Sequence, residues 1–310
     1  MTAAPPMTAA APAISPRRAW WLAIRPQTLP AAVAPVLVGL GAAVGIGTPF
    51  RLDTAAGALA VALLLQVVAN LANDLSDFRK GADTPDRQGP LRVAAAGLIT
   101  PRQLEIAIAI VIGLAGLVGL YLVWVGGVVL LLLGGAAILA ALLYTGGPMP
   151  YGYKGMGEVF VFLFFGLVAV TGTAYLQSLT VEPIYLAASV PVGALVTAIL
   201  VVNNLRDVPT DRVAGKRTLA VIFGERFAKN EYLVLLGVAA VVPVLLVWAG
   251  SLFSVLLPLA VFARTKPLTD AVLAVSNTSD RRQLNLVLKG TARLSLGYAV
   301  LFAIGLAIGA

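Results

Sequence analysis

Two stretches of this chain share one pattern of amide and acid side chains. The first reads Asn70-Leu-Ala-Asn73-Asp74-Leu-Ser-Asp77, and the second reads Asn203-Asn204-Leu-Arg206-Asp207-Val-Pro-Thr-Asp211. In both, an Asn precedes the first Asp by four residues, and a Gly follows the second Asp by four residues. Each stretch begins inside a long apolar run. We interpret the pair as an internal repeat, with one copy in each half of the chain.

Apolar runs like these recur along nearly the whole chain. Of its 310 residues, 59% are hydrophobic and 12% are charged, whereas a soluble domain is about one-quarter charged. A run of about 20 apolar residues crosses a bilayer, and a soluble core does not need one uncharged run after another. We therefore predict an all-α fold, a polytopic membrane helix bundle with about nine transmembrane helices. The predicted spans are roughly residues 28–47, 54–74, 103–123, 127–146, 157–177, 184–205, 231–249, 252–263 and 290–309.

Basic residues give the orientation expected for this bundle. The net charge is +8, and 21 of the 22 Lys and Arg residues fall on one side of the predicted spans, leaving Arg51 on the other. The positive-inside rule then places the N-terminus in the cytoplasm of a cell membrane and the C-terminus outside. Topology thereby explains the basic charge, and we predict no nucleic-acid partner. We expect residues 1–19 to form a disordered tail and residues 20–310 to form a single transmembrane domain of two pseudo-repeated halves.

The chemistry available to the chain is narrow, because it contains no His and no Cys. Histidine bases and thiolate nucleophiles are thereby excluded. On a helix, residues at i, i+4 and i+7 share one face, so the polar groups of each stretch point the same way. Pro209 would end or kink the second helix. Both stretches close even-numbered spans, so we expect them at water-facing helix ends on the cytoplasmic side, where they can converge on one cavity.

Carboxylates gathered at one site repel each other unless a cation neutralises them. Hard oxygen ligands without His or Cys favour Mg²⁺, which takes one or two protein carboxylates and completes its shell with water or phosphate oxygens. The candidate metal-binding carboxylates are therefore Asp74, Asp77, Asp207 and Asp211. The flanking cations that suit a polyanionic phosphate are Arg79, Lys80, Arg206, Lys216 and Arg217. The alternative, in which these charges only solvate helix ends, explains one such stretch more easily than two matched ones.

At these residues the chain resembles the UbiA superfamily of intramembrane prenyltransferases, whose members carry an NDxxD-type motif and a DxxxD motif. The resemblance extends over roughly residues 20–310 and includes the strings at 25–30, 144–155 and 203–219. It implies a helix bundle around a central cavity, with the four aspartates as the catalytic group. It also implies that a polyprenyl diphosphate is bound there through Mg²⁺ by Asn70, Asn73, Asp74, Asp77, Asn203, Asp207 and Asp211. It also implies that Tyr144 and basic residues, Lys154 among them, hold the diphosphate.

Two features bring the resemblance nearer to the branch that acts on 1,4-dihydroxy-2-naphthoate. Gly81 stands where ubiquinone-type members usually have a third Asp, with Asp83 as the nearest carboxylate, and ten residues separate Tyr144 from Lys154. This branch transfers the polyprenyl group to the naphthoate with loss of CO₂ and diphosphate, giving demethylmenaquinone. The resemblance therefore makes Arg25, Lys154 and Asp83 candidates for binding the aromatic acid acceptor.

Three interpretations stay open at this point. Another prenyltransferase of the same superfamily would use a different aromatic acceptor. A secondary transporter would also have an internal repeat and membrane carboxylates, although transporter sites lie near the bilayer midplane rather than at one face. Finally, four aromatic residues crowd the fifth span, where we expect ordinary packing more than cation–π contact with an allylic cation. They are Phe160, Phe162, Phe164 and Phe165.

Overall fold

The computed structural model describes residues 14–82, 88–276 and 280–309, which form helices and connecting segments without a strand. Within these residues, seven helical stretches are long and apolar enough to cross a membrane, and two shorter apolar helices, Val128–Leu143 and Phe253–Arg264, accompany them. The all-α membrane bundle is confirmed, and the protein is a multi-pass membrane protein. The total of nine spans and the side of the N-terminus stay predictions.

Each predicted span is occupied by a helical segment. The first half contains α1 (Pro16–Ile24), η1 (Pro26–Thr28), α2 (Leu29–Gly45), α3 (Leu52–Arg79), α4 (Pro101–Gly126) and α5 (Val128–Leu143). The fifth span is built from α6 (Gly157–Val161), the π-helix η3 (Phe162–Val168) and α7 (Ala169–Ser178), and it follows the short η2 (Tyr151–Tyr153). The rest contains α8 (Pro183–Val213), α9 (Leu219–Ile222), α10 (Glu225–Trp248), η4 (Phe253–Arg264), α11 (Lys266–Leu273), η5 (Arg281–Gln283) and α12 (Leu284–Gly309).

Helix α1 begins earlier than the predicted end of the N-terminal tail. Ser15 caps it by accepting the backbone N–H of Arg18 at 3.4 Å, and Pro16 occupies its first position, where no helical N–H is needed. Residues 16–19, the last residues of the predicted tail, are therefore helical. At the other predicted boundary, Asp83 lies outside the described residues.

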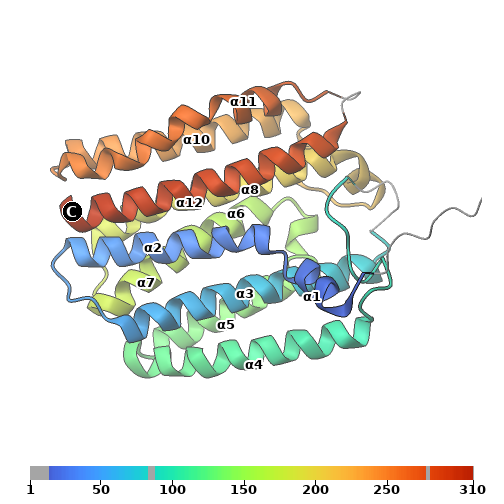
Figure 1. Cartoon of the computed structure of the whole chain (residues 1–310), viewed down its shortest axis with the longest axis horizontal. Coiled ribbons are helices and arrows are strands. Elements are labelled where there is room, and N and C mark those ends of the chain that lie inside the picture. The colour runs from blue at the N-terminus through green and yellow to red at the C-terminus, as the bar shows by residue number, and fades with distance from the viewer. Residues whose placement is uncertain (1–13, 83–87, 277–279, 310) are drawn as a thin grey trace, which may run out of the picture.

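The long connections gather at one end of the bundle. The chain turns between α2 and α3, α4 and α5, α7 and α8, and α10 and η4 at the opposite end, where the C-terminus also lies (Figure 1). The ends of α3 and α8 that carry the two acidic stretches both lie at the end with the long connections (Figure 1). The fold therefore places both stretches at the same depth.

Small residues bring the central helices close together. A Cβ at Gly41 of α2 would lie 2.4 Å from the Ala303 carbonyl oxygen of α12, and a Cβ at Gly39 would lie 2.4 Å from the Val170 carbonyl oxygen of α7. Such close approach is how helices gain packing energy in lipid, where no hydrophobic force drives them together. Helix α8 is the most buried of the seven long stretches, and α4 is the least buried.

Helix α8 continues through Pro209 to Val213, which corrects the expectation that the helix ends there. A proline has no N–H, so the carbonyl four residues earlier loses its helical donor. That carbonyl belongs to Leu205, and it accepts a hydrogen bond at 2.8 Å from Nη1 of Arg281, which lies in η5. Arg281 also pairs with Glu225 at the start of α10. A side chain from a later segment thus replaces the missing helical bond, and α8 carries Asp211 within its last turn.

Candidate active site

A cavity of about 680 Å³ runs through the bundle between α2, α3, α5, the fifth span and α8. On α3 its lining extends from Ala58 to Asp77, a length of about 28 Å at 1.5 Å per residue. Its wall is apolar over most of this length and polar at the end where α3 and α8 finish. The polar lining there includes Asn70, Asn73, Asp77, Asn203, Asp207, Asp211, Arg25, Arg92, Arg206, Lys216 and Tyr144.

Asp77 is the most heavily engaged carboxylate of the polar end. Its side chain is 1% exposed and accepts hydrogen bonds from Arg92 Nη2 at 2.7 Å, Lys216 Nζ at 3.2 Å and the Tyr153 hydroxyl at 3.0 Å. These three partners come from three separate connecting segments. Because a buried carboxylate is costly unless paired, Asp77 fixes the positions of the connections around the cavity mouth.

Asp74 has different hydrogen-bond partners from Asp77. Its carboxylate accepts the backbone N–H groups of Val93 at 3.2 Å and Ala94 at 3.0 Å, and it pairs with Arg25 at 3.4 Å. Asp74 is 1% exposed and is absent from the cavity lining, so its predicted place at a water-facing helix end is wrong. In this structure it anchors the segment after residue 88 to α3.

In the second acidic stretch, the charge of Asp207 is neutralised mainly by Arg206 of the same stretch. Arg206 donates to both carboxylate oxygens of Asp207, at 2.8 and 2.6 Å, and also to Asn203 and Asn285. Arg206 is 1% exposed and Asp207 is 4% exposed, so this pair too is buried rather than water-facing. Arg206 thereby connects two residues of α8 with Asn285 of α12, which makes it an organising residue of the α8 end.

The two stretches meet through Lys216. Its Nζ lies 3.2 Å from Asp77 of the first stretch and 3.9 Å from Asp211 of the second. Both aspartates line the same cavity. The convergence expected from the repeat is therefore present.

Tyr153 holds two cations beside this meeting point. The Nζ atoms of Lys80 and Lys216 lie 4.5 and 4.9 Å from the centroid of its ring, and Lys80 also donates to the Thr145 carbonyl oxygen at 2.5 Å. A ring face attracts ammonium groups and lets two of them approach the same region. Burial lowers the pKa of Lys80 below its usual value; Asp77 opposes this shift, and Lys216 adds to it.

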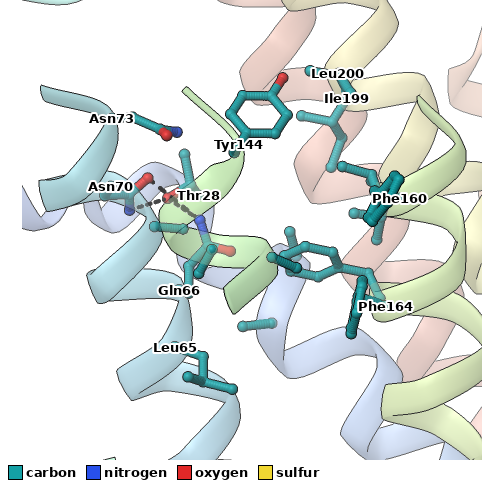
Figure 2. A pocket seen from close by; sticks show the side chains of 18 of the residues that line it. Thr28, Leu65, Gln66, Asn70, Asn73, Tyr144, Phe160, Phe164, Ile199 and Leu200 are labelled. Carbon is teal, nitrogen blue, oxygen red and sulfur yellow. Dashed lines mark hydrogen bonds between the residues drawn. The ribbon is translucent and has the colours of Figure 1, made fainter. Parts of the chain in front are cut away.

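The remaining predicted residues divide into two groups. Tyr144 lines the cavity, Asn73 accepts the Thr145 hydroxyl at 3.0 Å, and Asn70 belongs to a hydrogen-bonded cluster with Thr28 (Figure 2). In contrast, four predicted diphosphate-binding cations do not line the cavity, and all four are exposed. They are Lys80, Lys154, Arg217 and Arg79, the last of which pairs with Glu105.

Several cavity residues were missed by the sequence analysis. Tyr153 lies inside the string at 144–155, but neither Tyr153 nor Arg92 was predicted to have a role, because their contacts depend on how the connections fold. Gln66 is one turn before Asn70 on the same helix face, so helical spacing could have found it. The missed residues of the polar part are Gln66, Arg92, Tyr153, Asn204, Asn285 and Lys289.

The fifth span changes its helical pitch beside the cavity. Residues Phe162–Val168 form a π-helix, a rare conformation that is often found at functional sites. Phe160, Phe164 and Phe165 line the cavity, and only Phe162 of the four crowded aromatics is absent from its lining. The expectation of ordinary packing is therefore incomplete, since three rings also form cavity wall (Figure 2 shows two of them).

Comparison with known proteins gives consistent results over most of the chain. The family profile described as the UbiA prenyltransferase family matches residues 32–296. A 1,4-dihydroxy-2-naphthoate octaprenyltransferase from Mycobacterium tuberculosis is 46% identical over 230 residues, covering 74% of this chain and 78% of that protein. One from Escherichia coli is 44% identical over 229 residues, covering 72% and 74%. A UbiA homolog from Archaeoglobus fulgidus, solved bound to DMAPP and Mg²⁺, shares the fold with a TM-score of 0.65 at 19% identity, covering 93% of this chain and 98% of that one.

Proposed function

This chain belongs to the UbiA prenyltransferase family, and we propose that it transfers a polyprenyl group from polyprenyl diphosphate to 1,4-dihydroxy-2-naphthoate. In this reaction CO₂ and diphosphate are lost and demethylmenaquinol, the hydroquinone form of demethylmenaquinone, is formed. The relatives from Mycobacterium tuberculosis and Escherichia coli, both named for this acceptor, support the choice of substrate.

One observation carries the proposal: a single cavity is polar at one end and apolar along the rest. The polar end combines carboxylates, amides and cations, as a metal-bound diphosphate requires, and the apolar part suits an isoprenoid chain. The carboxylates lie at one end of the bundle instead of near its middle, which supports prenyl transfer over transport.

The oxygen ligands at the polar end fit Mg²⁺. Among the described residues, no three Asp or Glu side chains gather as a closed metal site. Mg²⁺ does not need such a group, because it usually takes one or two carboxylates and completes its shell with phosphate and water oxygens. Asp77 and Asp211, with Asp207 and the neighbouring Asn70, Asn73 and Asn203, would hold it. When bound, Mg²⁺ would stabilise the negative charge that develops on the departing diphosphate.

The protein's own cations bind the same diphosphate. Arg92, Lys80 and Lys216 surround Asp77 and Tyr153 at the polar end, and they stabilise the leaving group as its bond to the allylic carbon breaks. Phe160 and Phe164 face the interior beyond them, where ring faces stabilise the allylic cation. The apolar wall excludes the water that would otherwise quench this cation.

The acceptor enters this arrangement as the nucleophile. Its electron-rich ring attacks the allylic carbon at the carboxyl-bearing position. CO₂ then leaves from the carboxylate, and the electron pair of the broken carbon–carbon bond returns to the ring. Arg25 lines the cavity beside Asp74 and is our candidate for binding the acceptor carboxylate. Lys154 is exposed away from the cavity and Asp83 lies outside the described residues, so Arg25 is the supported choice. By the distribution of basic residues, the polar end faces the cytoplasm of a cell membrane.

The test follows the fate of the acceptor carboxyl group. Membranes containing the protein are given polyprenyl diphosphate and carboxyl-labelled 1,4-dihydroxy-2-naphthoate. Labelled CO₂ should appear in step with diphosphate, and the lipid product should carry no label. Label retained in a prenylated naphthoate, or turnover with 4-hydroxybenzoate and not with naphthoate, would show that the acceptor is wrong.

A further inference from the structure

Gln66 presents a hydrogen-bond acceptor that no described residue satisfies. Its Oε1 atom is buried without a partner, although the residue lines the cavity. Gln66 lies on α3, one helical turn deeper in the bundle than Asn70. A buried polar atom without a partner costs free energy, which a bound group with a suitable donor would recover.

Backbone carbonyl groups fix which way the Gln66 amide points. Asn70 Nδ2 donates to the Ile24 carbonyl oxygen at 2.8 Å, and the Thr28 hydroxyl donates to the Arg25 carbonyl oxygen at 2.9 Å. Carbonyl oxygens only accept, so Asn70 Oδ1 and Thr28 Oγ1 are left as acceptors for Gln66. Gln66 Nε2 donates to Thr28 at 3.2 Å and to Asn70 at 3.4 Å. The oxygen must therefore point the other way (Figure 2).

The backbone that supplies these carbonyls is itself strained. Arg25 has φ 53° and ψ 68°, a left-handed conformation that is unfavourable for a residue with a side chain. Such strain persists only where surrounding contacts enforce it. The cluster of Thr28, Gln66 and Asn70 supplies those contacts. The orientation of Gln66 is thus built into the junction between α1 and α2.

From this geometry we infer that Gln66 Oε1 accepts a hydrogen bond from a ring hydroxyl of the aromatic acceptor, which therefore lies against the α2–α3 wall. This inference rests on the proposed function. The prenyl donor offers no alternative partner, because its isoprenoid chain has no hydrogen-bond donor and its diphosphate has only acceptor oxygens once ionised.

The same contact places the acceptor for reaction. Phe160 and Phe164 stand across the cavity from Gln66, so a ring held at Gln66 faces the aromatic wall of the prenyl channel (Figure 2). A hydrogen bond from the hydroxyl to a neutral amide oxygen increases electron density in the ring without removing its proton. Gln66 is in this sense a specificity and positioning residue.

The test compares two competitive inhibitors, 1-hydroxy-2-naphthoate and 4-hydroxy-2-naphthoate, each of which lacks one ring hydroxyl. Inhibition constants are used because they do not depend on ring reactivity. The wild-type protein should bind one analogue about tenfold more tightly than the other, since only one retains the recognised hydroxyl. Gln66→Met should bind both within about twofold, with the KM for prenyl diphosphate near wild type.

Gln27→Met is the matched control, because it makes the same change at another glutamine of the cavity lining. It should keep the wild-type preference between the analogues. Equal inhibition of the wild type by both analogues would overturn the inference, as would a preference that survives in Gln66→Met or is lost equally in Gln27→Met. Wild-type turnover of the dihydroxy acceptor in those cases would leave the proposed function standing, and its absence would mark the failure of that function instead.

Discussion

The ends of α3 and α8 carry the same spacing of Asn and Asp, but they are held in place differently. Asp77 at the end of α3 depends on Arg92, Tyr153 and Lys216, which are 15, 76 and 139 residues away along the chain. Asp207 at the end of α8 is bound by the adjacent Arg206. The two stretches therefore share the spacing of their oxygen ligands, but different kinds of contact neutralise their charges. One half is assembled only when the whole chain folds, and the other is arranged locally.

Removing the metal ion by chelation should abolish prenyl transfer, however each helix end is held in place. If both ends serve one Mg²⁺-bound diphosphate, EDTA should reduce prenyl transfer at least about 1,000-fold, and added Mg²⁺ should restore it. The measurement is product formation in washed membranes. Full activity in metal-free membranes would contradict the shared metal site, however the two ends are held.

Single substitutions of Asp77 and Asp211 should show which of the two helix ends contributes more to catalysis. Asp77→Asn should lower kcat about 100-fold, because Asp77 organises three cationic or hydroxyl partners at the cavity mouth. Asp211→Asn should lower it about tenfold, since its ion pair with Lys216 is longer at 3.9 Å. The matched control is Asp270→Asn, an exposed partner of Lys266, which should retain activity. Equal losses at Asp77 and Asp211 would show that the structural asymmetry has no functional counterpart.

Asp74→Asn should separate stability from activity at the α3 end. An Asn has one acceptor oxygen, so it cannot keep both backbone bonds to Val93 and Ala94, and it loses the ion pair with Arg25. We expect a loss of about 1–3 kcal/mol in stability as well as reduced turnover. Thermal unfolding of the purified protein in detergent measures the first effect. An unchanged melting temperature would show that Asp74 does not anchor this segment.

The smallest expected effect tests how the α8 end is supported. Arg281→Met should destabilise the protein, and part of that cost should disappear in a Pro209→Ala background, because Ala restores a helical N–H to the Leu205 carbonyl. The coupling should be about 1 kcal/mol, measured as a double-mutant cycle of melting temperatures. Strict additivity would mean that the Arg281 bond does not substitute for the helical one.

Much of this organisation was predictable from local pattern, and the rest depended on contacts between distant segments. Apolar runs predicted the helices, and the spacing of Asn70 and Asp77 against Asn203 and Asp211 predicted the convergence. Charge alone could not distinguish Lys216, which bridges the two ends, from the exposed Arg217 beside it.

The roles of Arg92, Tyr153 and Gln66 were not predictable in this way. Arg92 and Tyr153 acquire their roles only where separate connections meet around Asp77. For Gln66, the informative fact is the direction of its amide, which depends on the carbonyl groups of Ile24 and Arg25 on another helix. Residue type and helical spacing place such a group on a face, but they do not say what it contacts.

The apolar part of the cavity has a thermodynamic consequence for the choice of donor. An isoprenoid tail that enters it moves from the hydrocarbon of the bilayer to a cavity wall of similar polarity. The transfer therefore releases little of the free energy that burial from water would give. Binding selectivity is then concentrated in the last turns of α3 and α8, and each further isoprene unit changes affinity very little. The length of the chain that is transferred should accordingly follow the diphosphates that the cell's membrane contains.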